Sequence, residues 1–417
     1  MSWHRISIAL LSAFILSSNL LHAKELMVLS EDELIMRGLF YEEMGAFEQS
    51  REVFGKLFDI KGEKEYLFKE VAASLIGKTN IAQSITRLKT WDKQHPDTLE
   101  ARRLLIPLYL TNNEIAEAKK EAEYLLERSD DAIDLELASN PFLYTGEFQR
   151  ALSLLSKVYE KTVNEDVLLH MATIMKEYTH EQKKAIQLLE MHRRMHESGD
   201  ELYLKLISLY VKENDIDGIL ETYKALYAQS PKKKYLAKII DAYAYKNDLD
   251  GAIAFLESIQ QGKDILYVLY KEKRDFKNAM RLADQFYENE KDAKWLAEKG
   301  ILIFEDAKNK DDKKMIASVL DYLEKAIALG VDDSVYLNYY GYTLIDKNVD
   351  IKKGIKIIED ALVQQPGNTY YLDSLAWGYY KEHQCKKAYQ LMKKVVDQEG
   401  LEEPEIVEHW KTIQKCK

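Results

Sequence analysis

The fold of this chain is decided near its C-terminal end. Residues 337–366 read LNYYGYTLIDKNVDIKKGIKIIEDALVQQP, and residues 372–395 read LDSLAWGYYKEHQCKKAYQLMKKV. Each stretch contains two amphipathic segments separated by a short polar turn. The second segment of each carries a small residue, Gly354 or Ala388, followed by apolar residues four and seven positions later. This spacing forms one apolar stripe along a helix, and a small side chain lets a partner helix approach closely. Each stretch therefore predicts a packed pair of helices.

The same anchor position recurs through most of the chain, and nine of its eleven residues are Ala, Ser or Gly: Ser50, Ser84, Ala118, Ala151, Ala185, Ile219, Ala252, Ala279, Val319, Gly354 and Ala388. The successive spacings are 34, 34, 33, 34, 34, 33, 27, 40, 35 and 34 residues. The short spacing and the long one together equal two ordinary spacings, so the array recovers its phase. A fixed period of this length predicts a stack of about eleven helix-turn-helix repeats.

The last two units carry the pattern best, through Leu337, Gly341, Gly354, Ile358, Ala361 and Pro366, and then Leu372, Leu375, Ala376, Tyr379, Ala388, Met392 and Val395. Over about residues 30 to 400 the chain resembles the tetratricopeptide repeat family. The resemblance implies an all-α, right-handed superhelical solenoid with a concave groove lined by the first helix of each pair. The domains expected are a signal peptide (1–23), the repeat array (24–400) and a C-terminal capping helix (401–417).

Local departures from the repeat give further expectations. Asn140-Pro141 falls inside a first helix and predicts that this helix is short or kinked. The 27-residue spacing predicts a truncated first helix in the eighth unit. Extra residues in the ninth unit predict a charged loop over Asp306 to Lys313. Ser30 and Glu33 have the spacing of a capping box and mark the start of the first helix.

The N-terminus has the three parts of a secretory signal. Arg5 supplies positive charge, Ile6 to Leu21 is almost wholly apolar, and Leu21-His22-Ala23 ends the run before Lys24. We expect cleavage after Ala23 and export to the periplasm. The alternative is a retained membrane anchor, although an apolar run of about 16 residues is short for a span.

Net charge and residue composition indicate which partners and which fold class to expect. The formal charge is −11, and an acidic chain repels phosphate backbones, so we expect no nucleic-acid partner. The chain has 17 Gly and 6 Pro in 417 residues, and so few helix breakers favour a mostly helical protein.

Two motifs have the appearance of chemical sites. Residues 72–79 (AASLIGKT) fit a relaxed phosphate-loop pattern, but no predicted strand precedes them, as that loop requires. His192 and His196 are four residues apart on a predicted helix, yet zinc needs three or four ligands, and packing is the simpler interpretation. No nucleophile and base are set together. We therefore expect no enzyme activity, no cofactor and no metal.

The resemblance places polar and aromatic residues of the last two units in the groove, where they would bind a partner: Asn338, Tyr342, Tyr370, Asp373, Trp377 and Tyr380. The alternative is that these rings pack between repeats. Cys385 and Cys416 lie near one rim of the array by repeat geometry, so a disulfide could fix the capping helix in an exported protein. Two separate thiols are the alternative.

These features favour a periplasmic protein-protein interaction scaffold that docks envelope proteins in its groove. The alternative function is a glycan-binding or regulatory subunit of an envelope polysaccharide system. No small-molecule substrate is evident, and peripheral association with a membrane is left open.

Overall fold

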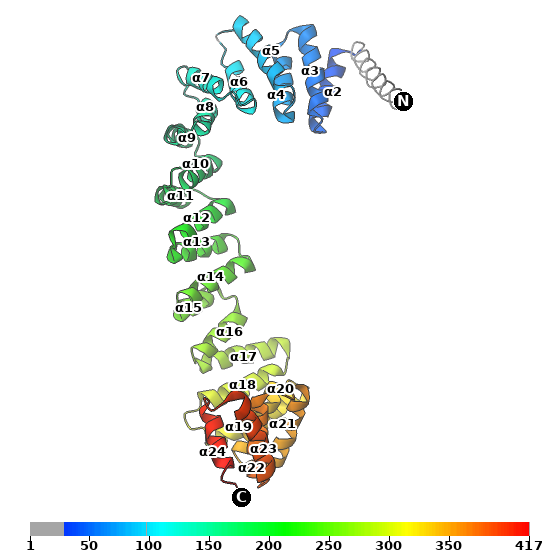
Figure 1. The fold of residues 1–417 in the computed structure, drawn as a ribbon, viewed down its shortest axis with the longest axis vertical. Coiled ribbons are helices and arrows are strands. Elements are labelled where there is room, and N and C mark those ends of the chain that lie inside the picture. Colours follow the sequence, from blue (N-terminus) through cyan, green and yellow to red (C-terminus); the bar gives the residue numbers. More distant parts are fainter. Residues whose placement is uncertain (1–28, 97, 417) are drawn as a thin grey trace, which may run out of the picture. The chain divides into compact units, whose positions relative to one another are not determined.

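The computed structural model describes residues 29–96 and 98–416 (Figure 1). These residues form 23 helices and no strand. The predicted signal peptide, residues 1–23, lies outside the described part of the chain. Within that part, no helix is both long enough and apolar enough to cross a membrane.

The helices divide into two compact units, the first ending at Leu236 and the second beginning at Ala237. The first unit contains six helix pairs: α2 (Glu31–Glu43) with α3 (Phe47–Lys61), α4 (Lys64–Gly77) with α5 (Ile81–Gln94), α6 (Glu100–Thr111) with α7 (Ile115–Leu126), α8 (Ala132–Tyr144) with α9 (Phe148–Thr162), α10 (Glu165–Glu177) with α11 (Gln182–Met195), and α12 (Asp200–Glu213) with α13 (Ile216–Gln229).

The second unit begins within α14 and contains the remaining pairs and a last single helix: α14 (Lys233–Tyr245) with α15 (Leu249–Ile259), α16 (Lys263–Glu272) with α17 (Phe276–Glu290), α18 (Lys294–Asp306) with α19 (Lys313–Ala328), α20 (Ser334–Asp346) with α21 (Ile351–Gln364), α22 (Thr369–Lys381) with α23 (Cys385–Glu399), and α24 (Pro404–Ile413). The described residues thus confirm the eleven predicted pairs and the terminal helix.

Small residues set the closeness of the paired helices. Gly341 on α20 and Gly354 on α21 face each other so closely that a Cβ on Gly354 would lie 2.6 Å from the Gly341 carbonyl oxygen. In the sixth unit the contact falls one residue earlier than predicted. There Gly218 packs against Tyr210, and Ile219 is only partly buried. The ring of Tyr210 on α12 lies so close to α13 that a Cβ on Gly218 would be 2.4 Å from it, so the facing residue must be glycine.

The helix α8 runs for 13 residues and continues through Pro141. Of the two expected outcomes, a short helix or a kinked one, the short helix is therefore wrong. Proline has no N–H to donate to the carbonyl of Leu137, four residues earlier. The side-chain amide of Asn140 donates to that carbonyl instead, over 3.4 Å, and also to the carbonyl of Glu136. The asparagine beside the proline thus compensates for the missing hydrogen bond.

The other local expectations are confirmed. Ser30 and Glu33 form the capping box at the start of α2. The loop between α18 and α19 spans residues 307–312. The predicted truncation of the eighth unit's first helix is confirmed, because α16 has only 10 residues. The helix before it, α15 of the seventh unit, is short as well, with 11 residues. The turn between these two helices is tight, with left-handed backbone at Gln260 and Gly262.

Candidate functional site

Three of the six residues predicted to line a groove contact the terminal helix α24. Tyr342 on α20 donates a hydrogen bond to Glu405 of α24. Asp373 on α22 pairs with His409 of α24. Burial, together with the Glu405 carboxylate, raises the pKa of Tyr342 well above its usual value. At these positions the first-helix side of the last two pairs is covered by the chain's own α24.

Trp377 on α22 lies at the centre of this arrangement. Its ring stacks on the imidazole of His409, with centroids 4.1 Å apart, and on the ring of Tyr380, with centroids 5.0 Å apart. Its indole N–H donates to Asp346 of α20 over 3.3 Å. The two faces and the polar edge of the indole are therefore engaged within the chain.

The remaining two residues differ from each other. Tyr370 is 58% exposed and lies in the first turn of α22. Asn338 on α20 has a buried side-chain oxygen that accepts no hydrogen bond from the described residues. Partner binding by the six residues stays a prediction, and only Tyr370 presents most of its surface to solvent.

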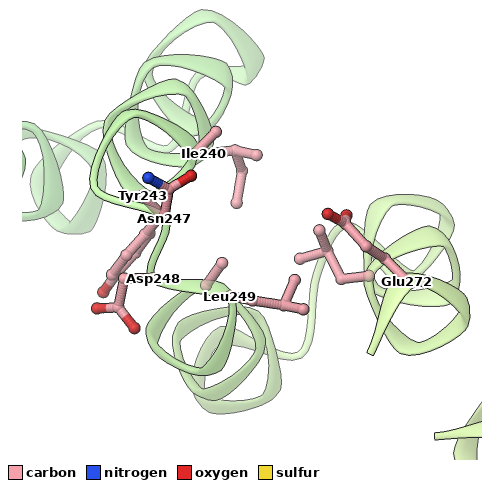
Figure 2. Close-up of a pocket in the computed structure, with 9 residues that line it drawn as sticks. Ile240, Tyr243, Asn247, Asp248, Leu249 and Glu272 are labelled. Carbon is pink, nitrogen blue, oxygen red and sulfur yellow. The ribbon is translucent and has the colours of Figure 1, made fainter. Parts of the chain in front are cut away.

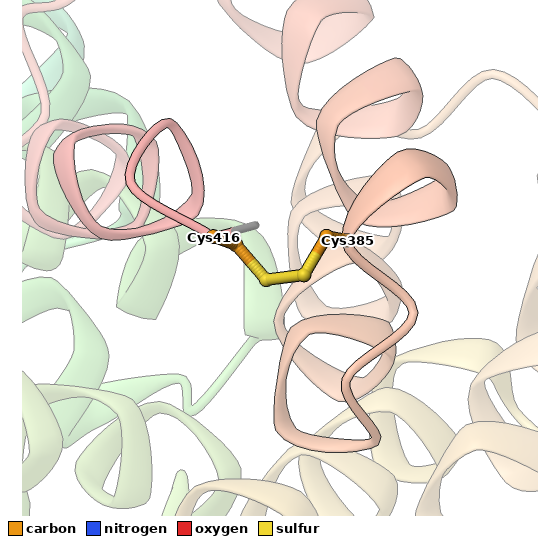
Figure 3. Close-up of a disulfide and its surroundings, with 2 residues drawn as sticks. All are labelled: Cys385 and Cys416. Carbon is orange, nitrogen blue, oxygen red and sulfur yellow. A yellow bond between two sulfur atoms is a disulfide. The ribbon is translucent and has the colours of Figure 1, made fainter.

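A disulfide joins Cys385 to Cys416 (Figure 3). Cys385 is the first residue of α23, and Cys416 follows the end of α24. Their Cα atoms are 5.5 Å apart, within the range that a disulfide spans. The bond fixes the C-terminal end of α24 beside the last helix pair.

The phosphate-loop pattern falls on α4 and the turn after it. Gly77 is the last residue of α4, Lys78 follows in left-handed conformation, and the hydroxyl of Ser74 bonds the carbonyl of Thr79. In the described chain no strand precedes this segment, and a phosphate loop needs that strand to aim its amides. The segment is the turn between the two helices of one repeat.

His192 is a packed residue. It is buried, and its Nδ1 lies 2.6 Å from the hydroxyl of Tyr159. Burial lowers the pKa of His192, although the nearby carboxylate of Glu165 opposes this. The rings of His192 and His196 are 4.8 Å apart. Among the described residues no group of three or more His, Cys, Asp or Glu side chains is placed to hold a metal ion.

The sequence analysis missed a set of exposed apolar side chains in the first unit, which we call the first-helix row. Its members lie at or just beyond the C-terminal ends of first helices and are 57–66% exposed: Ile76, Tyr144, Tyr178 and Val211. Each precedes the anchor position of its own unit (Ser84, Ala151, Ala185 or Ile219) by seven or eight residues. They therefore occupy equivalent places in their repeats. The spacing of 34 residues between Tyr144 and Tyr178 is the signal that could have found them.

A pocket of about 310 Å³ lies beside this row, between α8 and α10. Tyr144 and Tyr178 line it together with Phe148, and the rings of Phe148 and Tyr178 stack with centroids 4.6 Å apart. Leu143 and Ile174 add aliphatic surface to the lining. The pocket suits an aromatic or aliphatic side chain.

A second pocket, of about 320 Å³, opens in the second unit between α14, α15 and α16 (Figure 2). Ile240, Leu249 and Leu269 supply its apolar surface, and Glu272 lies at its edge on α16. The first helix on one side of this pocket is the truncated α16.

These features, above all eleven helix pairs at a period near 34 residues with small residues at the contact, decide the architecture. The fold is that of a tetratricopeptide-repeat array. Solved structures that align with the chain include a tetratricopeptide repeat protein from Parabacteroides merdae, which is 14% identical, with a TM-score of 0.34. That alignment covers 67% of this chain and 98% of the other.

Two further structures align with the array. The Cut9–Hcn1 hetero-tetramer of the APC/C is 11% identical over 93% of this chain and 97% of that chain, with a TM-score of 0.40. The TPR2AB domain of yeast Sti1 in complex with pHSP90 is 14% identical over 68% of this chain and 98% of that chain, with a TM-score of 0.27. No family model matches the sequence, and no curated protein matches it. Likenesses this distant say nothing about what the array binds.

Proposed function

We propose that this array is a scaffold that binds another protein along the first helices of residues 29–236. The observation that carries the proposal is the first-helix row, Ile76, Tyr144, Tyr178 and Val211, with the aromatic pocket beside it. Large apolar side chains at matching places on the second, fourth, fifth and sixth repeats are the kind of surface that anchors an extended or helical segment of a partner. The activity is binding rather than catalysis.

The charge of the chain indicates the kind of partner. A protein with a formal charge of −11 attracts basic proteins and accelerates their encounter. The partner segment would bring apolar or aromatic side chains for the pocket and basic side chains for the surrounding surface.

The site of action in this proposal is the bacterial periplasm. The support is the arrangement of Arg5, the apolar run from Ile6 to Leu21 and the small residue Ala23, which is the pattern of a cleaved signal. The partner is then an envelope protein or part of an envelope assembly. Intact mass of the protein from fractionated cells tests this. A periplasmic chain that begins at Lys24 supports it, and a full-length cytoplasmic chain contradicts it.

A photo-crosslinking residue at position 178, introduced in living cells, tests the binding surface. We expect one dominant protein adduct from position 178. Lys183, exposed on the second helix of the same pair, is the matched control position and should give no such adduct. Position 377 tests the groove expected from the sequence. The proposal fails if position 178 yields no protein adduct, or the same adducts as position 183.

A further inference from the structure

A second, chemically different cavity lies beside the turn between the seventh and eighth units, where both adjoining helices are short. Its volume is about 400 Å³, and it lies between the end of α15, the start of α16 and the middle of α17. The second helix α15 has 11 residues, whereas α13 and α17 have 14 and 15. The turn of helix that is absent from α15 would otherwise pack against α17. The cavity is therefore a consequence of the 27-residue spacing.

One wall of the cavity is basic. Lys263 at the start of α16 reaches across to α17, where its Nζ donates to the side-chain oxygen of Gln285 over 3.2 Å. Arg281 lies one helical turn before Gln285 on α17, on the same face of that helix. The Arg281 guanidinium bonds only the side-chain oxygen of Asn278, over 3.3 Å. Among the described residues, neither cation has a carboxylate at ion-pair distance.

The opposite wall and the floor have other chemistry. Glu257 on α15 lines the cavity and accepts a hydrogen bond from the hydroxyl of Tyr270 over 2.5 Å. Gln260, at the end of α15, adds an amide to the lining. The floor is aliphatic, and it is made by the buried side chains of Leu256, Leu266 and Leu282.

Arg281 and Lys263 line one cavity together, and among the described residues neither is paired with a carboxylate. A carboxylate on a ligand would give both cations an ion-pair partner, since Arg and Lys bind carboxylates through charge-assisted hydrogen bonds. Amide and carboxylate side chains around them are suited to ligand hydroxyl groups, which both donate and accept. The aliphatic floor suits the carbon face of a ring, and the volume is in the range of small-molecule sites.

We propose that this cavity binds a small sugar acid, that is, a ligand of uronic-acid type that carries one carboxylate and several hydroxyl groups. The carboxylate lies against Arg281 and Lys263, and the hydroxyl groups contact Glu257 and the glutamine amides. This site is separate from the first-helix row, so it does not depend on the proposed scaffold function.

Calorimetric titration of the purified full-length mature protein with D-glucuronate tests the site. We expect saturable binding with a Kd of about 1 mM or tighter, the affinity that a ligand of this size can reach. D-glucose, which lacks the carboxylate, should bind at least about tenfold more weakly. Arg281→Gln should weaken D-glucuronate binding at least about tenfold, because it removes a charged hydrogen-bond donor.

Lys263→Gln is a second variant on a different helix, with the same expectation. Lys291→Gln, an exposed substitution at the residue that follows α17, is the matched control and should bind like the parent protein. Both binding variants should keep the parent melting temperature, since Lys263 and Arg281 are exposed. The proposal is overturned if the parent protein shows no saturable binding at about tenfold above the expected Kd. Equal binding of D-glucose, or equal weakening by Lys291→Gln, overturns it as well.

Discussion

The side chains of Asp373 on α22 and His409 on α24 meet at 3.0 Å, with both carboxylate oxygens facing Nδ1 of the imidazole. Both side chains are less than a tenth exposed. The same imidazole stacks on Trp377, so one residue of the terminal helix contacts both a charge and a ring of the last repeat. The terminal helix is therefore held by specific polar contacts as well as by the buried Ile406 and Ile413.

Replacing His409 with Ala should loosen α24 from the last pair. The change leaves the buried Asp373 carboxylate without its partner, which costs about 1–3 kcal/mol. We expect faster amide hydrogen exchange throughout α24 and greater quenching of Trp377 fluorescence by acrylamide. Glu408→Ala, on the exposed side of the same helix, is the control and should leave both unchanged. Unchanged exchange in the His409 variant would contradict this role.

The disulfide should contribute strongly to the stability of the C-terminal end. It closes a loop with a sequence separation of 31 residues, and such a cross-link contributes about 3–4 kcal/mol by restricting the unfolded chain. Intact mass should show two hydrogens fewer without reductant than with it. The paired change of Cys385 and Cys416 to Ser should lower the unfolding midpoint. Two free thiols in the exported protein would refute the bond.

Adding one methyl group at Gly354 should destabilise the tenth repeat. A Cβ there would lie 2.6 Å from the Gly341 carbonyl oxygen, so α20 and α21 would have to move apart. We expect Gly354→Ala to cost about 1–3 kcal/mol in urea unfolding. Gly367→Ala is the matched control, because a Cβ at Gly367 meets no atom within 4 Å. Similar losses in both variants would show that the close approach is unimportant.

Glu298 on α18 should make part of the stability depend on pH. Its carboxylate accepts hydrogen bonds from the hydroxyl of Tyr267 and the ammonium group of Lys271, both on α16. It also accepts one from the hydroxyl of Tyr336 on α20. Burial alone would raise the pKa of Glu298, but these donors outweigh burial and lower it. A lowered folded-state pKa gives stability that is present above the unfolded value, about 4.5, and is lost as the pH falls further.

Melting temperatures between pH 7 and pH 3 check this expectation. The parent protein should lose more stability than Glu298→Gln as the pH falls below about 4.5, so the difference between the two shrinks in acid. Glu288→Gln, exposed on α17, is the control and should follow the parent curve. A constant difference between the parent and Glu298→Gln across this range would rule out the linkage.

Much of the architecture is predictable because it repeats. A small residue near every 34th position, with apolar residues four and seven later, is a local pattern that each helix pair must satisfy on its own. The capping box at Ser30 and the truncated α16 are equally local, and the structure confirms them. The extended length of α8 was not predicted, because the amide of Asn140 replaces the hydrogen bond that Pro141 cannot make.

What the sequence by itself determined is the number and pairing of the helices, since these depend on contacts between residues less than one repeat apart. Only the tertiary structure decided which side chains remain available to a partner. Trp377 lies on the first helix α22 and Tyr178 at the end of the first helix α10, yet α24 packs on Trp377, and Tyr178 stays 57% exposed. Exposure depends on whether a following helix packs over the residue. That packing involves contacts such as Tyr342 with Glu405, 63 residues apart, which no periodicity encodes.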